Sequence, residues 1–252
     1  MKELKEYLKN LIKKMGFDPE EGKQGIYIKK YNYINKTNEN KIHTIKIDFN
    51  NENIEYGEEI TVGDKTTSNF SSKENFVVLE CVNRLLEKGY SPEKITLEIK
   101  WDLGKKEKGK LDIYVADKDD DTKCFLMIEC KTFEEEYDKE KKNMLSNGGQ
   151  LFSYFQQDKS AKYLCLYAST LIDDEIHYTN SIVEINEDIK NADHKNESYS
   201  IWNKSFKDKG IFEDDASLYQ LNLKALTYKD LKDLKQKDSG FIFNKFSEIL
   251  RH

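Results

Sequence analysis

The stretch that decides the fold is GKLDIYVADKDDDTKCFLMIECK, residues 109–131. Two segments rich in apolar, β-branched and aromatic residues flank the polar run 117–122, a pattern typical of two antiparallel strands joined by a turn. The second segment ends in Glu129, Cys130 and Lys131. Carboxylate and ammonium groups are costly to bury without partners, so their presence at the end of a buried strand indicates chemistry there.

The position of the turn predicts how the two strands pair. A hairpin centred between Asp120 and Asp121 sets Asp112 opposite Glu129. Directly opposed side chains have Cβ atoms roughly 4.5–5.5 Å apart, so the two carboxylates can share one cation. Strand alternation points Lys131 to the same face as Glu129 and Cys130 to the other face. A bulge in the hairpin would shift this register.

Paired carboxylates of this kind suit a hard divalent cation. Mg²⁺ keeps several waters and accepts substrate phosphate oxygens as further ligands, and we expect it at Asp112 and Glu129, with Mn²⁺ as an alternative. Such a cation polarises a scissile phosphate and lowers the pKa of a bound water. Lys131 would then position the attacking water or stabilise the charge that develops on the phosphoryl group.

Asp112, Glu129 and Lys131, in this order, resemble the active site of the PD-(D/E)xK nuclease superfamily, with Leu111 where the motif often has proline. Downstream, Gln150 and Tyr154 are four residues apart and would share a helix face. This addition resembles the nuclease domain of type I restriction enzyme R (motor) subunits and of single-chain restriction-modification enzymes. The similarity covers about residues 76–168.

The resemblance implies further roles at the site. Gln150 and Tyr154 would orient the DNA backbone or the catalytic lysine, and Glu80 matches the acidic residue that many members carry before the triad. Glu80 also has a structural alternative, because Arg84 lies four residues on and an ion pair on the helix surface explains both residues equally well. Tyr154 likewise lies among apolar residues and can be read as a core aromatic.

Composition narrows the class of protein. The chain has 252 residues, 37% of them hydrophobic and 35% charged, without an apolar run long enough to span a bilayer or a secretory signal, so we expect a cytoplasmic protein with no membrane partner. The N-terminal segment 1–15 is predicted to be a helix docked on the protein's own core. Single cysteines at 81, 124, 130 and 165 argue against a zinc site.

Charge is distributed unevenly along the chain. The net charge is −6, but lysines 100, 105, 106, 108 and 110 precede Asp112, and lysines 139, 141 and 142 follow Lys131. Both groups can flank a DNA cleft, or can simply be loops of a lysine-rich chain. With only two arginines, Arg84 and Arg251, bidentate readout of guanine is not expected, and sequence choice would belong to another domain or subunit.

The predicted fold class is α/β (α+β): a restriction-endonuclease-like mixed β-sheet flanked by helices, with an N-terminal helix and an antiparallel β extension. We expect residues 1–68 to form that helix and extension, with strands at 25–33, 41–49 and 53–62. Residues 69–185 would form the nuclease core, with a helix at 74–88, strands at 95–101, 111–116 and 125–131, the Gln150 helix and a strand at 163–168. Residues 186–252 would form a linker and a C-terminal helical segment.

The predicted function is that of a Mg²⁺-dependent DNA endonuclease domain of a restriction-modification enzyme. The chain ends without a helix-capping signal, so we expect an N-terminal piece of a longer protein, with DNA and a downstream methyltransferase or ATP-dependent motor domain, or a specificity subunit, as partners. ATP or S-adenosylmethionine would act only through those missing domains, because no phosphate-binding loop and no Asn-Pro-Pro motif occurs here. The alternatives are a catalytically silent DNA-binding or subunit-docking module with the nuclease fold, and a DNA repair or recombination nuclease.

Overall fold

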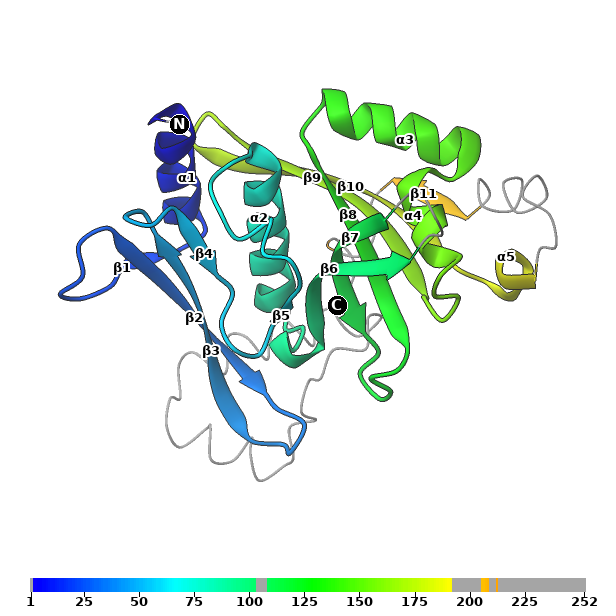
Figure 1. The fold of residues 1–252 in the computed structure, drawn as a ribbon, viewed down its shortest axis with the longest axis horizontal. Coiled ribbons are helices and arrows are strands. Elements are labelled where there is room, and N and C mark those ends of the chain that lie inside the picture. The colour runs from blue at the N-terminus through cyan, green and yellow to red at the C-terminus, as the bar shows by residue number, and fades with distance from the viewer. Residues whose placement is uncertain (1, 103–107, 192–204, 209–211, 213–252) are drawn as a thin grey trace, which may run out of the picture. The chain divides into compact units, whose positions relative to one another are not determined.

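The computed structural model describes residues 2–102, 108–191, 205–208 and 212. The chain divides into two compact units, Met1–Asn222 and Leu223–His252, and all described residues lie in the first. They form a mixed α+β structure with five α-helices and two β-sheets (Figure 1). The helical segment predicted near the C-terminus lies outside the described residues.

The helices are α1 (Lys2–Lys14), α2 (Lys73–Glu87), α3 (Glu135–Asn147), α4 (Gly149–Phe155) and α5 (Glu187–Asn191), with a short 3₁₀ helix, η1 (Pro92–Lys94). The small sheet contains β1 (Asp18–Pro19), β2 (Ile26–Ile34), β3 (Asn40–Asp48) and β4 (Asn53–Glu55). The large sheet contains β5 (Thr61–Val62), β6 (Ile95–Asp102), β7 (Lys108–Ala116), β8 (Cys124–Thr132), β9 (Tyr163–Ile172), β10 (Glu175–Glu184) and β11 (Phe206–Asp208).

The large sheet is mixed, as predicted. Its strand order is β11-β10-β9-β8-β7-β6-β5. The hairpins β6–β7, β7–β8 and β9–β10 are antiparallel, whereas β8 and β9 run parallel. Parallel neighbours need a crossover connection, and here α3 and α4 supply it.

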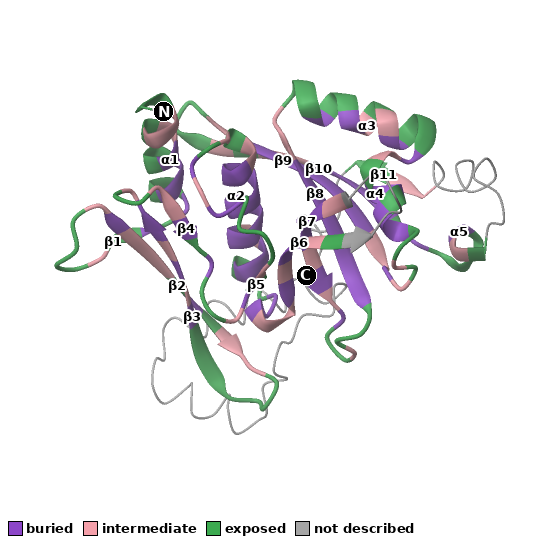
Figure 2. Ribbon diagram, viewed as in Figure 1, coloured by how far each residue is buried: buried purple, intermediate pink, exposed green. Residues whose placement is uncertain are grey.

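Both faces of the large sheet are covered. Leu126, Ile128 and Cys130 of β8 face a core shared with α1, α2 and the small sheet, and α2 lies between the two sheets (Figure 1). Met127 faces a second core, shared with α3 and α4. Burial on both faces explains why β8 is apolar at nearly every position, and Figure 2 shows it buried along most of its length.

Helix α1 docks on the protein's own core, as predicted. Its residues Leu8, Leu11 and Ile12 are buried among side chains of α2 and the small sheet. No helix in the described part of the chain combines the length and apolar character needed to cross a membrane.

Several features of the fold differ from the expectation. Strand β11 lies in the segment 186–252 that was predicted as linker, and it pairs antiparallel with β10 at the edge of the large sheet. The strand predicted at 53–62 is split into β4 and β5, which belong to different sheets, because the chain turns at Gly57 with φ +80°. Helix α3 was not predicted, since its apolar stripe is reduced to Tyr137 and Met144 in a highly charged segment. Strand β10 was also missed, because its first half is largely solvent-facing and its sequence is polar.

Candidate active site

The candidate site is built on the β7–β8 hairpin. Ile113 pairs with Ile128 and Val115 with Leu126. The register, continued by one residue, sets Asp112 opposite Glu129, in agreement with the prediction. The hairpin does contain a bulge, between Val115 and Ala116. It lies between the turn and Asp112 and shifts the register by one residue, because Ala116 pairs with Cys124 whereas Ile113 pairs with Ile128. Only this shifted register sets Asp112 opposite Glu129.

Both carboxylates are buried. Asp112 is 6% exposed, and its Oδ2 accepts a hydrogen bond of 2.8 Å from the backbone N–H of Cys130. Glu129 is 2% exposed, and its Oε1 accepts a bond of 2.6 Å from the Lys131 ammonium. Its other oxygen, Oε2, is buried and has no hydrogen-bond partner among the described residues. A buried carboxylate oxygen left in this way is costly unless a ligand satisfies it.

The pKa values of Asp112, Glu129 and Lys131 show how burial and neighbouring charges act on the site. Burial raises the pKa of Asp112 from 3.8 to about 6, although the Cys130 N–H and the Lys131 ammonium oppose the shift. Burial and the neighbouring Asp112 carboxylate together raise the pKa of Glu129 well above its usual range. Burial lowers the pKa of Lys131, but the Glu129 carboxylate outweighs that effect and keeps the ammonium charged. Two buried carboxylates therefore share one ammonium, an arrangement that favours binding of a further cation.

Helix α2 brings a carboxylate to the site, but it is not that of Glu80. Glu74, in the first turn of α2, lies with its Oε1 3.9 Å from the Lys131 ammonium. The Glu80 carboxylate pairs with Arg84, as in the alternative interpretation, but it is buried (1% exposed) and not on the helix surface. It also accepts a hydrogen bond from the Tyr167 hydroxyl. The sequence carried no signal for Glu74, because the distance between α2 and β8 depends on packing.

Tyr154 lies beside the two carboxylates. It is 2% exposed, and its hydroxyl donates a 2.9 Å hydrogen bond to the backbone carbonyl of Lys110. Burial raises the pKa of Tyr154, and the charges of Glu129 and Asp112 raise it further. The exposed Gln150 side chain hydrogen-bonds to Tyr154. The structure thus brings both residues of the predicted pair to the β7–β8 hairpin.

The start of α4 is held by a buried residue of α3. The Oε1 of Glu140 accepts a 2.8 Å hydrogen bond from the backbone N–H of Gln150, and its Oε2 accepts one of 3.0 Å from Asn143. Gly149 has φ +58°, and a Cβ there would lie 2.4 Å from the same Oε1. Glycine is thus required twice at this position, for the backbone conformation and for the space that Glu140 fills.

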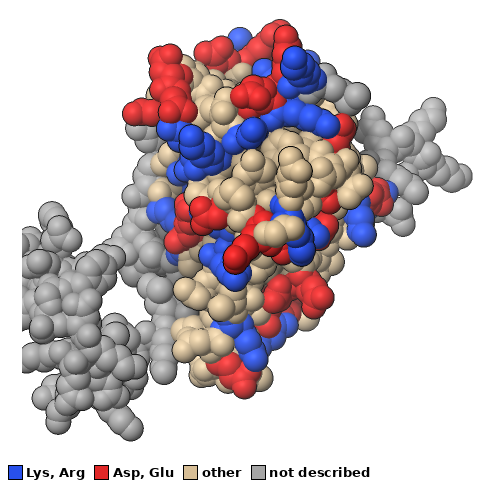
Figure 3. All heavy atoms as spheres, turned by 90° about the vertical axis from the view of Figure 1, so that its left-hand side faces the viewer, with Lys and Arg blue, Asp and Glu red and all other residues tan. Residues whose placement is uncertain are grey.

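The predicted lysine groups do not form a uniform basic surface in the described part of the chain. The Lys100 ammonium pairs with Asp64, that of Lys141 lies 2.6 Å from Asp208, and that of Lys139 lies 3.9 Å from Glu136. Lys105 and Lys106 lie outside the described residues. On the face that Figure 3 shows, basic and acidic side chains are interspersed. Flanking of a DNA cleft by these lysines remains a prediction.

The kind of metal ion that the site could hold depends on the ligand atoms that its side chains offer. Within the described ranges, no group of three or more His, Cys, Asp or Glu side chains is arranged to hold a metal ion, and the four cysteines are free and buried. The site therefore offers two carboxylates and one unsatisfied oxygen. That set fits Mg²⁺, which is commonly held by one or two carboxylates with waters and phosphate oxygens as its other ligands.

Comparison with models of known protein families gave no match, and comparison with curated proteins gave no match either.

Proposed function

We propose that this chain is the nuclease domain of a restriction-modification enzyme and hydrolyses DNA phosphodiester bonds with Mg²⁺, or Mn²⁺, held by Asp112 and Glu129. The observation that carries the proposal is the Glu129 carboxylate, which has one oxygen on Lys131 and the other buried without a partner, opposite Asp112 in register. The mixed sheet, with helices on both faces, supports a restriction-endonuclease-like fold. A cytoplasmic location and a methyltransferase, motor or specificity partner belong to the same proposal.

Each residue of the site has a separate role in this proposal. Asp112 and Glu129 bind the cation, and Mg²⁺ supplies Lewis-acid activation of the phosphate and of a bound water. Lys131, charged and held by Glu129, stabilises negative charge on the phosphoryl group or orients the attacking water. Glu74 provides a second carboxylate within reach of that ammonium, and Tyr154 fixes the backbone of β7 next to Asp112.

One observation favours a second candidate, a catalytically silent DNA-binding or docking module with the same fold. The Lys131 ammonium already bonds to Glu129 at 2.6 Å, so the ion pair satisfies one carboxylate oxygen without any metal. In such a module, the chain would bind neither Mg²⁺ nor Mn²⁺ at Asp112. Metal binding therefore separates the two candidates.

The test is a calorimetric titration of Mg²⁺ or Mn²⁺ into the wild-type chain and into Asp112→Asn. The control is Asp119→Asn, which removes an exposed aspartate from the turn of the same hairpin. We expect binding to wild type and to the control, but not to Asp112→Asn, and nicking of supercoiled DNA to follow the same pattern. If all three proteins bind the metal alike, or none does, the proposed site is wrong.

A further inference from the structure

Lys110 lies on β7 two residues before Asp112. Alternation places the two side chains on the same side of the strand, with Cα atoms about 7 Å apart. The Lys110 side chain is 26% exposed, so its ammonium reaches solvent. Its positive charge is among those that oppose the burial-driven rise in the pKa of Asp112, so it lies within electrostatic range of the candidate metal ligands.

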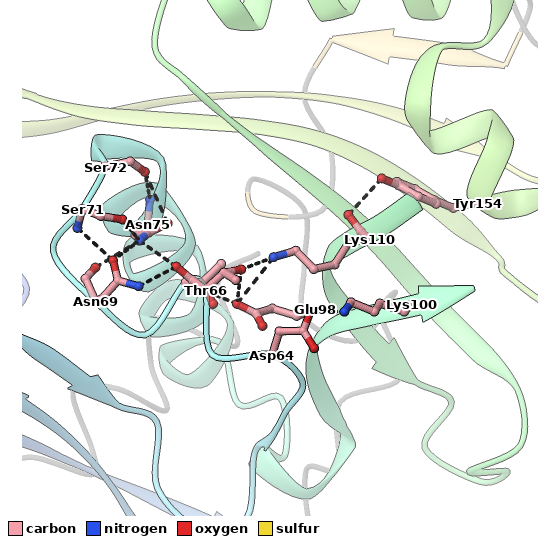
Figure 4. Close-up of polar contacts among 11 residues, drawn as sticks. Asp64, Thr66, Asn69, Ser71, Ser72, Asn75, Glu98, Lys100, Lys110 and Tyr154 are labelled. Carbon is pink, nitrogen blue, oxygen red and sulfur yellow. Dashed lines mark hydrogen bonds and ion pairs between the residues drawn. The ribbon is translucent and has the colours of Figure 1, made fainter. Parts of the chain in front are cut away.

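Lys110 is held at both ends (Figure 4). Its backbone carbonyl accepts the hydrogen bond from the Tyr154 hydroxyl, at 2.9 Å. Its ammonium donates to the Thr66 hydroxyl and lies 3.8 Å from the Glu98 Oε1. That distance is too long for a hydrogen bond, so Glu98 orients the ammonium by charge without taking up one of its donors.

Glu98 is an unusual residue for the middle of a strand. Its neighbours pair with β7, Leu97 with Ile113 and Ile99 with Leu111, so its position is opposite Asp112. Glu98 itself does not take part in this pairing, and its backbone has φ +61°. It is 1% exposed, and a Cβ at Gly63 would lie 2.6 Å from its backbone oxygen. A non-glycine residue in this conformation costs about 1–3 kcal/mol and persists only where the surroundings impose it, often at functional sites.

The Glu98 carboxylate is tied to the loop before α2. Its Oε1 accepts hydrogen bonds from the Thr66 hydroxyl, at 2.9 Å, and from the backbone N–H of Thr67. The loop is fixed in turn by the buried Asn75 of α2, whose Nδ2 donates to the Thr66 carbonyl at 3.0 Å. Glu98 Oε2 is buried and has no partner among the described residues. The carboxylate is therefore held in place. Burial raises its pKa, but the hydrogen bonds from Thr67 and Thr66, together with the charge of Lys110, outweigh the effect of burial and leave the pKa lowered.

We propose that Lys110 binds a phosphate oxygen of the DNA backbone next to Asp112, and that Glu98 is the positioning residue that holds the ammonium there. This inference rests on the proposed function and names a substrate contact within it. An ammonium has three donors, and the contacts to described residues use one of them, at Thr66. The remaining donors are available to a phosphate, with which a charge-assisted bond forms. The competing explanation is that Lys110 only neutralises Glu98.

The experiment is a titration of a short fluorescent DNA duplex with the chain, in the presence of EDTA and over a range of salt concentrations. Each phosphate contact contributes about 0.9 to the slope of log K against log salt. We expect Lys110→Ala to reduce that slope by about one unit and Lys110→Arg to retain it. The matched control is Lys118→Ala, which removes a lysine from the far end of the same hairpin and should leave the slope unchanged. The Lys118 ammonium lies 3.9 Å from the Asp119 carboxylate, a distance similar to that between Lys110 and Glu98.

Glu98→Gln tests the positioning role. The amide can still accept from Thr66 and Thr67 but does not attract the ammonium, so we expect weaker DNA binding with the salt slope reduced toward that of Lys110→Ala. If Lys110→Ala fails to fold because Glu98 loses its counter-charge, the double variant Lys110→Ala/Glu98→Gln removes both charges and should show the same loss of slope.

Equal slopes for Lys110→Ala, Lys118→Ala and wild type would overturn the inference, as would a wild-type chain without salt-dependent DNA binding. The titration contains no metal. A chain that binds DNA through Lys110 but binds no Mg²⁺ would therefore confirm this contact while contradicting the proposed nuclease activity.

Discussion

The carboxylate of Asp112 accepts a hydrogen bond from the backbone N–H of Cys130, with 2.8 Å between Oδ2 and the nitrogen. This bond ties Asp112 to the strand that carries Glu129 and Lys131, through a backbone donor that every residue at position 130 except proline supplies. A backbone N–H has no net charge, so it orients the carboxylate without neutralising it. The pKa of Asp112 accordingly remains raised, to about 6.

That raised pKa predicts a loss of stability with rising pH in the metal-free protein. The folded chain holds the Asp112 proton more tightly than the unfolded chain, so the free energy of unfolding falls as pH rises from about 4 to about 6. The loss is at most about 3 kcal/mol, at about 1.4 kcal/mol per pKa unit. We expect Asp112→Asn to lack this loss and to be the more stable protein at neutral pH, as measured by urea unfolding. Stability curves that run parallel across this range would contradict the prediction.

Saturating Mg²⁺ should restore, in wild type, the stability that the metal-free protein loses as pH rises. A cation bound between the carboxylates stabilises their charged forms, and a ligand that binds only the folded state raises the free energy of unfolding. We expect the midpoint of thermal unfolding to rise with Mg²⁺ at neutral pH in wild type and to stay constant in Asp112→Asn. A rise of equal size in both proteins would place the binding elsewhere.

The two glutamates of α2 should separate stability from metal chemistry. Glu80→Gln leaves the half-buried Arg84 without its carboxylate, and we expect a loss of about 3 kcal/mol in the free energy of unfolding, with Mg²⁺ affinity unchanged. Glu74 is 41% exposed, so Glu74→Gln should cost little stability but should reduce DNA nicking, because it removes a carboxylate next to Lys131. The measurements are urea unfolding, calorimetry and nicking on both variants. If Glu80→Gln reduced Mg²⁺ affinity and nicking while Glu74→Gln did not, Glu80 would be the site residue after all.

Gly149→Ala and Glu140→Ala should disturb the same contact. The alanine Cβ would displace the Glu140 carboxylate from the N-terminus of α4 and would add backbone strain at φ +58°. We expect each variant to lose about 1–3 kcal/mol. Because residues in contact are coupled, the double variant should lose less than the sum of the two, as a double-mutant cycle in urea would show. Additive losses would mean that the two residues act independently.

Tyr154→Phe removes one hydroxyl from the edge of the site. The lost bond to the Lys110 carbonyl should cost about 1 kcal/mol of stability. Since Tyr154 is not an expected metal ligand, Mg²⁺ affinity should change little, while DNA nicking should fall because the backbone of β7 beside Asp112 is less firmly held. A variant that loses Mg²⁺ binding would assign Tyr154 a different role.

Local signals in the sequence were sufficient for the β7–β8 hairpin. The polar turn and the apolar segments on either side of it predicted the hairpin, and the predicted pairing of Asp112 with Glu129 agrees with the structure. The turn alone does not set that register, because the bulge between Val115 and Ala116 shifts it by one residue. The apolar stripe of α1 predicted its docking. Helix α3 and strand β10 were not predictable in this way, since neither is buried along a continuous apolar face.

The sequence by itself thus determined the hairpin, the mixed α+β class and the order of the residues that we propose for the site. Only the tertiary structure decided which distant groups surround them. Glu74 reaches Lys131 in place of Glu80 because six residues along an α-helix turn the side chain to another face and move it by about 9 Å. Glu98 meets Lys110 because β6 and β7 pair and the loop before α2 folds over them. Such contacts depend on packing between elements, and spacing along the chain does not record that packing.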